Sequence, residues 1–178
     1  MVVLVGYVSA HGSTREIAER IGTRLAESGC AVEVRPLDYM MTVDRYAAFV
    51  LGSAVHSRRW LPEAAAFLQR HRDALAHGGV WLFSVGMPAA LRGPWRRFAG
   101  REEAIVLDAL APVPGLRGHR LFSGVVTREQ IGRVGALLLR LLGGHPGDYR
   151  DWEAVDAWAR EIAGELLAAG RGKPSAGY

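Results

Sequence analysis

The sequence predicts an α/β domain, a three-layer α/β/α sandwich in which helices cover both faces of a five-stranded parallel sheet. Two observations support this prediction: short apolar runs rich in β-branched residues recur along the chain, and helical patterns separate them. Parallel strands buried on both faces have such runs, and they need crossover connections. A length of 178 residues is typical of one domain. We expect residues 1–170 to form it, followed by a flexible tail at 171–178.

The first strand and helix follow directly from the amino-terminal residues. Val2–Val8 is a continuous apolar run, as expected for a strand buried on both faces. Isoleucine and leucine then recur every four residues over Ile17–Leu25, which predicts an amphipathic helix. Ser13 with Glu16 matches a capping box at the start of that helix.

The same alternation continues along the chain. Further strands are predicted at Ala31–Leu37, Ala47–Ser53, Val80–Val85 and His119–Val126. Further helices are predicted at Leu61–His77, around Arg101–Leu110, from Thr127 to about Leu142, and from Asp151 onward. In the last helix Val155, Trp158 and Ile162 fall on one face, which is expected to pack on the sheet. Right-handed crossovers would join these strands into one sheet.

Composition and charge limit the partners. The net charge is +4 and the pI about 9.7, which suits an anionic partner without choosing among nucleic acid, membrane surface and acidic small molecule. No aromatic-basic motif or recognition helix supports nucleic-acid binding, so none is expected. The single cysteine excludes an internal disulfide, and six scattered histidines make a metal site unexpected. No apolar run is long enough for a signal peptide or membrane span, so we expect a cytoplasmic protein, with peripheral contact at the inner membrane face left open.

Three loops follow predicted strands at the sheet edge where such folds bind ligands. The first, Ser9–Thr14, offers three hydroxyls, a glycine and the free amides of a helix start, which favour a phosphate. An ordinary helix cap is the alternative. The glycine-rich dinucleotide fingerprint and the phosphate loop ending in Gly-Lys-Ser/Thr are absent, which disfavours NAD or ATP bound in those modes.

The second and third loops, Gly52–Trp60 and Ser84–Pro88, have small residues that let a flat ring approach the backbone. His56 is a candidate proton donor, the one candidate catalytic side chain, and a loop histidine without function is the alternative. Aromatic and basic side chains nearby are candidates for substrate contact, with a solvated basic rim as the alternative. They are Arg58, Arg59, Trp60, Arg92 and Trp95, with Arg96 and Arg97 beside them.

Ser9–Thr14 resembles the phosphate loop of flavodoxins, whose usual form is Thr/Ser-x-Thr-Gly-x-Thr, with His11 at the central hydroxyl position. The whole chain is similar to the flavodoxin-type, quinone-dependent protoporphyrinogen oxidases. The features that carry this likeness are the first loop with Arg15-Glu-Ile-Ala18, Gly52-Ser-Ala-Val55, the glycine pair at 143–144, and Asp151-Trp-Glu with Ala159-Arg-Glu-Ile-Ala163.

The resemblance implies a flavodoxin-like fold with strand order 2-1-3-4-5 and FMN as cofactor. Its phosphate would lie on the first loop and its isoalloxazine between the other two. The residues implied for the cofactor are Ser9, Ala10, His11, Gly12, Ser13, Thr14, Ser53, Ala54, Val55, His56, Ser57, Ser84, Val85, Gly86 and Met87. In that family electrons pass from a porphyrinogen to a membrane quinone. This chain departs from the family at residues 134–142, an apolar segment where the family is rich in arginine, tyrosine and lysine.

A non-catalytic electron carrier of the same fold, docking on a reductase, is the alternative function. Such carriers are typically acidic near the flavin, whereas the loops here are basic. A receiver-like signalling module would need an acidic pair after the first strand, where Ser9-Ala10 stands, and an aspartate ending the third. That function is therefore set aside. The expected partners are an anionic or aromatic small molecule and a quinone or reductase; the sequence leaves a monomer and a homo-oligomer open.

Overall fold

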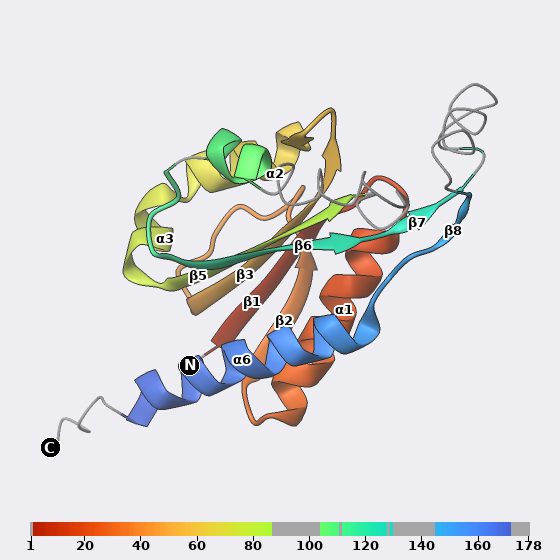
Figure 1. Cartoon of the computed structure of the whole chain (residues 1–178). Coiled ribbons are helices and arrows are strands. Elements are labelled where there is room, and N and C mark those ends of the chain that lie inside the picture. Colours follow the sequence, from red (N-terminus) through yellow and green to blue (C-terminus); the bar gives the residue numbers. More distant parts are fainter. Residues whose placement is uncertain (1, 87–103, 111, 128, 130–144, 172–178) are drawn as a thin grey trace, which may run out of the picture.

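The predicted parallel sheet is present and has the predicted strand order. The computed structural model describes residues 2–86, 104–110, 112–127, 129 and 145–171. Its main sheet runs β2-β1-β3-β5-β6, all parallel (Figure 1). These strands are β1 (Val2–Val8), β2 (Ala31–Pro36), β3 (Tyr46–His56), β5 (Gly79–Gly86) and β6 (Leu116–Ser123). Counted among the five predicted strands, this is the order 2-1-3-4-5.

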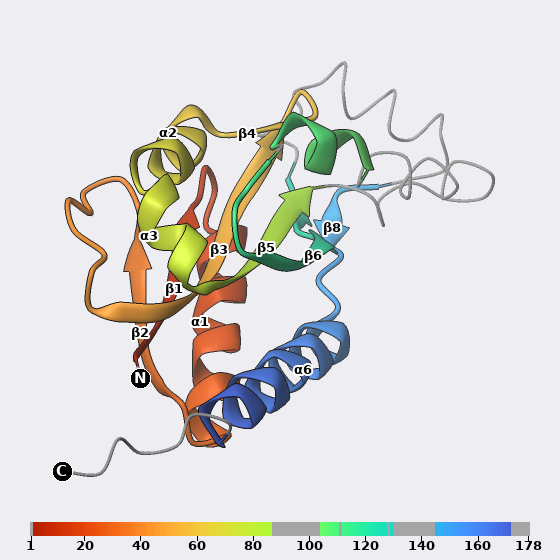
Figure 2. The same cartoon turned by 90° about the vertical axis from the view of Figure 1, so that its left-hand side faces the viewer.

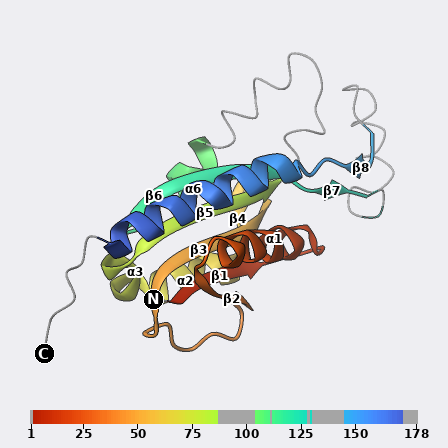
Figure 3. The ribbon, with the colours of Figure 1, turned by 90° about the horizontal axis from the view of Figure 1, so that it is seen from below.

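Helices cover both faces of the sheet. α1 (Ser13–Glu27) and α6 (Trp152–Arg171) lie side by side on one face (Figure 3). α2 (Pro62–Arg70), α3 (Arg72–His77) and a short helix at 104–109 pack on the other. The helix predicted from Thr127 to about Leu142 lies outside the described residues. Among the helices that the structure describes, none combines the length and apolarity needed to cross a membrane.

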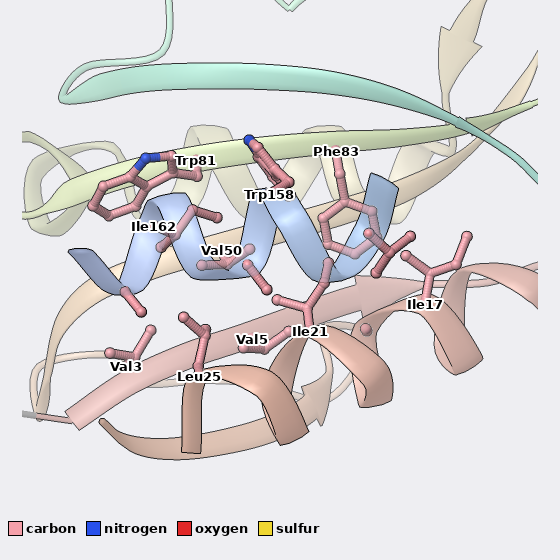
Figure 4. Packing of buried hydrophobic residues seen from close by; sticks show 14 of the residues in the cluster. Val3, Val5, Ile17, Ile21, Leu25, Val50, Trp81, Phe83, Trp158 and Ile162 are labelled. Atoms are coloured by element: carbon pink, nitrogen blue, oxygen red, sulfur yellow. The ribbon is translucent and has the colours of Figure 1, made fainter. Parts of the chain in front are cut away.

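The core has two halves, one on each face of the sheet. Side chains alternate across a strand, so Val3 and Val5 of β1 face α1 and α6, whereas Leu4 packs with the residues of α2. Figure 4 shows Trp158 and Ile162 of α6 and three residues of α1 pointing toward Val5, Val50 and Phe83 of the sheet. The continuous apolar runs are therefore strands buried on both faces, as the sequence predicts.

Two elements differ from the sequence prediction. The helix predicted over Leu61–His77 is two helices, because His71 leaves helical geometry with φ −105° and ψ 19°. The strand predicted over His119–Val126 is broken at Gly124, whose N–H donates to the Gly86 carbonyl and ends the regular ladder of β6.

Two short strand pairs complete the structure. β4 (Arg59–Trp60) folds back antiparallel on the end of β3, where the sequence predicts a loop. β7 (Val125–Val126) pairs with β8 (Gly147–Asp148), and this pair brings the chain from β6 to the start of α6. Figure 2 shows the β3–β4 hairpin standing at the carboxyl end of the sheet, which is where ligands bind in such folds.

Candidate functional site

A cavity of about 370 Å³ lies at the carboxyl ends of β1, β3 and β5. It is lined by Ser9, Ala10, His11, Ser13, Thr14, Ala54, Val55, His56, Leu61, Val85, Gly86, Gly124 and Val125. All three predicted loops contribute, so the structure brings together residues that the sequence separates by up to about 80 positions. The volume is within the range of small-molecule sites, roughly 300–1,000 Å³. No carboxylate is among these lining side chains.

The first loop presents an open helix end to this cavity. α1 begins at Ser13, and its N-cap Gly12 has φ 93°, a left-handed conformation that glycine adopts without strain. Among the described residues, no side-chain cap hydrogen bond is formed at this helix end, and the Gly12 N–H donates to Ser9 Oγ at 2.9 Å. The predicted capping box is therefore wrong, because Ser13 is already inside the helix. The amides of Ser13, Thr14 and Arg15 precede the first intrahelical bond, which runs from the Glu16 N–H to the Gly12 carbonyl, and free amides at a helix start stabilise an anion.

Ser13 connects the Ser9–Thr14 loop to another segment of the chain. Its Oγ accepts a hydrogen bond from the Val125 N–H at 3.1 Å, which joins the loop to the start of β7. A Cβ added to the neighbouring Gly124 would lie 3.3 Å from Ser13 Cβ and 3.1 Å from Val85 Cγ1. The glycine therefore permits a close approach of three segments around the cavity. A glycine inside a strand pattern is the signal that could have pointed to this position.

Two of the predicted cofactor residues are buried and hydrogen-bonded within the protein. Ser53 and Ser84 are opposite each other on β3 and β5, fully buried, and outside the cavity lining. Ser53 Oγ accepts from the Leu61 N–H at 3.0 Å, and Ser84 Oγ accepts from Trp60 Nε1 at 2.8 Å. Ser84 Oγ also lies 2.9 Å from His119 Nε2. These hydroxyls anchor the last residue of β4 and the residue that follows it.

The hairpin between β3 and β4 turns through Ser57 and Arg58, with φ 50° and 62°. Positive φ at both turn residues is typical of a type I′ hairpin, which normally uses asparagine and glycine. Trp60, a predicted candidate for substrate contact, is 6% exposed, and its ring packs in the core. Arg58 and Arg59 are exposed, and neither has an ion-pair partner among the described residues.

The remaining predicted positions divide into two groups. Ser57 and Gly12 belong to the predicted loops without lining the cavity. Met87, Arg92 and Trp95 lie outside the described residues. Three residues that line the cavity are not among the predicted ones: Leu61, Gly124 and Val125. The sequence prediction places them in a helix and a strand, outside the three loops. Within the described ranges, no cluster of three or more His, Cys, Asp or Glu side chains could hold a metal ion.

The model of the flavodoxin domain family matches residues 4–99, more than half of the chain. The chain belongs to the flavodoxin family. Among curated proteins, none matches this flavodoxin-family sequence.

Solved structures show the same fold. Rubredoxin:oxygen oxidoreductase from Desulfovibrio gigas superposes with a TM-score of 0.60 at 16% identity, over 94% of this chain and 36% of that one. This flavodoxin-family chain therefore spans about a third of that oxidoreductase. A flavodoxin from an archaeon gives 0.55 at 17% identity, over 94% and 99% of the two chains. Flavodoxin 2 from Bacillus cereus gives 0.55 at 19% identity, over 92% and 98%.

Membership of this family implies FMN, and the residues of the cavity fit it. The uncapped start of α1 and the hydroxyls of Ser9 and Thr14 would hold the phosphate. The small residues Ala54 and Gly86, at the ends of β3 and β5, would flank the flat ring. The absence of carboxylates from the lining side chains agrees with an anionic cofactor.

Proposed function

We propose that this protein is an FMN-dependent oxidoreductase that oxidises an anionic, reduced aromatic substrate of the porphyrinogen kind and reduces a quinone. The observation that supports the anionic substrate is the β3–β4 hairpin. Its β3 arm contributes Val55 and His56 to the cavity lining, Leu61 directly follows its β4 arm and also lines the cavity, and its tip carries the exposed Arg58 and Arg59. Carboxylates of a substrate at the cavity mouth would meet guanidinium groups able to bind them in bidentate fashion.

The hairpin is built to keep these arginines in place. Turn residues other than glycine at positive φ cost free energy, and such backbone persists where the surroundings hold it. Here the surroundings are the buried Trp60 ring and the two hydrogen bonds to Ser53 and Ser84. The tip therefore presents its charges from a fixed base rather than from a loose loop.

These contacts suggest a role in the reaction for each part of the site. FMN, when bound, supplies the redox chemistry of the reaction. Arg58 and Arg59 orient the substrate, and the small residues at the strand ends admit it to the ring. His56 lines the cavity and is exposed, so its imidazole would exchange a proton with the substrate during oxidation.

The test compares an anionic with a neutral substrate. The double variant Arg58→Gln with Arg59→Gln should raise KM for a porphyrinogen by about tenfold or more, since charge-assisted hydrogen bonds contribute roughly 1.5–3 kcal/mol. The KM for a neutral quinone should change little. A matched control, Arg70→Gln with Arg160→Gln, removes the same charge from exposed positions on α2 and α6 outside the cavity lining. Equal effects on both substrates, or none, would contradict the proposed role of the hairpin.

A non-catalytic electron carrier is the second candidate, because the matched flavodoxins correspond to this chain over nearly their whole length. It predicts a different outcome. The FMN-loaded protein would accept electrons from a flavodoxin reductase and pass them on, with no turnover of porphyrinogen in the presence of quinone. Turnover with quinone as the acceptor excludes this second function.

A further inference from the structure

A carboxylate lies beside the loop that is expected to hold the FMN phosphate. Glu16 is in the first turn of α1, and its N–H donates to the Gly12 carbonyl at 3.0 Å. Its Oε1 atom would be 3.8 Å from a Cβ placed on Gly12. Such a carboxylate favours the helix start through the helix dipole, but it also repels an anion bound at the same helix end.

Arg150 pairs with this carboxylate from the far end of the chain. It lies just before α6 and forms an ion pair with Glu16, 134 positions away, in the segment that runs beside α1 (Figure 1). Two hydrogen bonds to Asp148, at 2.9 Å from Nε and 2.6 Å from Nη2, hold the guanidinium. It also lies over the Trp152 ring at 4.8 Å, and its side chain is only 13% exposed.

The other arginines of this region are engaged elsewhere. Arg15 pairs with Glu19 at 3.5 Å on the exposed side of α1. Arg20 donates to Asp156 at 2.6 and 2.7 Å. Among the described residues, the cluster at the loop therefore holds two carboxylates, Glu16 and Asp148, against one guanidinium, that of Arg150, whose loss would leave both charges unbalanced.

We propose that Arg150 is a positioning residue for the cofactor: by pairing with Glu16 it offsets the negative charge beside the phosphate loop and fixes the first turn of α1. It acts on the phosphate group through Glu16. The inference depends on FMN binding and is independent of the substrate proposed above.

The test is titration of the apo-protein with FMN and with riboflavin, which lacks the phosphate, followed by flavin fluorescence at low ionic strength. Arg150→Gln should weaken FMN by about tenfold and leave riboflavin nearly unchanged. Adding Glu16→Gln to that variant should restore FMN affinity to within about threefold of the wild type. Raising the salt concentration should shrink the difference, because part of the cluster is exposed.

Arg24→Gln is the matched control. It removes an arginine that also links α1 to α6, through Asp156 at 2.9 Å, away from the loop. This variant should melt at a lower temperature while keeping wild-type FMN affinity. If Arg150→Gln does not fold, Glu16→Gln alone serves: it should tighten FMN about twofold or more without changing riboflavin. Equal weakening of both flavins, no change in FMN affinity, or no rescue by Glu16→Gln would overturn the inference.

Discussion

The two faces of the sheet are covered by helices of different kinds. On one face the long helices α1 and α6 pack together, and Asp156 of α6 accepts hydrogen bonds from both Arg20 and Arg24 of α1. On the other face α2, α3 and the helix at 104–109 are short, and within the described residues no ion pair involves α2 or α3. On the first face, α1 begins at the Ser9–Thr14 loop. On the second face, α2 follows the β3–β4 hairpin that carries Arg58 and Arg59.

The two faces therefore differ in how their helices are attached to the rest of the protein. The helix that starts at the phosphate loop is connected to the rest of the protein by charged hydrogen bonds as well as by apolar packing. The helices behind the hairpin have no ion pair within the described residues and pack on the sheet through apolar contacts, with the buried His71 packed on Phe67 at 4.6 Å between ring centroids. The α1–α6 face is therefore held by charged hydrogen bonds as well as packing, and the α2–α3 face mainly by packing.

The largest effects should come from the apolar contacts, which both faces share. Trp158→Ala removes a ring that contacts Phe83 and Phe122 at 6.3 and 5.6 Å between centroids, and Phe67→Ala removes its counterpart on the other face. Each should lower the free energy of unfolding by about 3–5 kcal/mol, measured by urea denaturation. A loss below about 1 kcal/mol for Phe67→Ala would mean that α2 is not part of the core.

The strands follow from the sequence because period and burial are local properties, whereas their order is what the resemblance to flavodoxins implies, and the structure confirms it. The hairpin does not follow from the sequence, since Ser57-Arg58 lacks the asparagine-glycine signal that marks a type I′ turn. The sequence places Gly52 in a loop of small residues that would let a flat ring approach the backbone. In the structure, its missing side chain leaves space for Phe83, whose Cζ would lie 2.0 Å from an added Cβ. The pairing of Glu16 with Arg150 joins residues 134 positions apart, and only the tertiary fold reveals it.

A smaller effect on stability is expected from Asp156, which lies on the α1–α6 face. Hydrogen bonds from Arg20 and Arg24 hold the pKa of this carboxyl below its usual range. A carboxyl with a lowered folded-state pKa stabilises the protein above its unfolded value, about 3.9, and this contribution is lost as pH falls further. Asp156→Asn should therefore lower the urea midpoint at pH 7 and flatten its decline between about pH 5 and 2.

The control for Asp156 is Asp73→Asn, which removes an exposed carboxylate from α3 on the other face. It should leave both the midpoint at pH 7 and its decline with acid close to those of the wild type. A decline in Asp156→Asn as steep as in the wild type would show that the arginines do not stabilise this face through Asp156.

The smallest effect on stability is expected on the α2–α3 face, at pH values closer to neutral. Burial is the main cause that lowers the pKa of His71, and its Nε2 atom is buried without a hydrogen-bond partner among the described residues. The folded state therefore binds the proton less tightly than the unfolded state, whose histidine titrates near pH 6.5. Stability should fall as pH decreases from about 8 to 5.5, a window well above that of Asp156. His71→Phe should remove most of this slope in urea midpoints, whereas His77→Phe, the same change at an exposed position of α3, should retain it. An unchanged slope in His71→Phe would mean that the pH dependence arises outside this face.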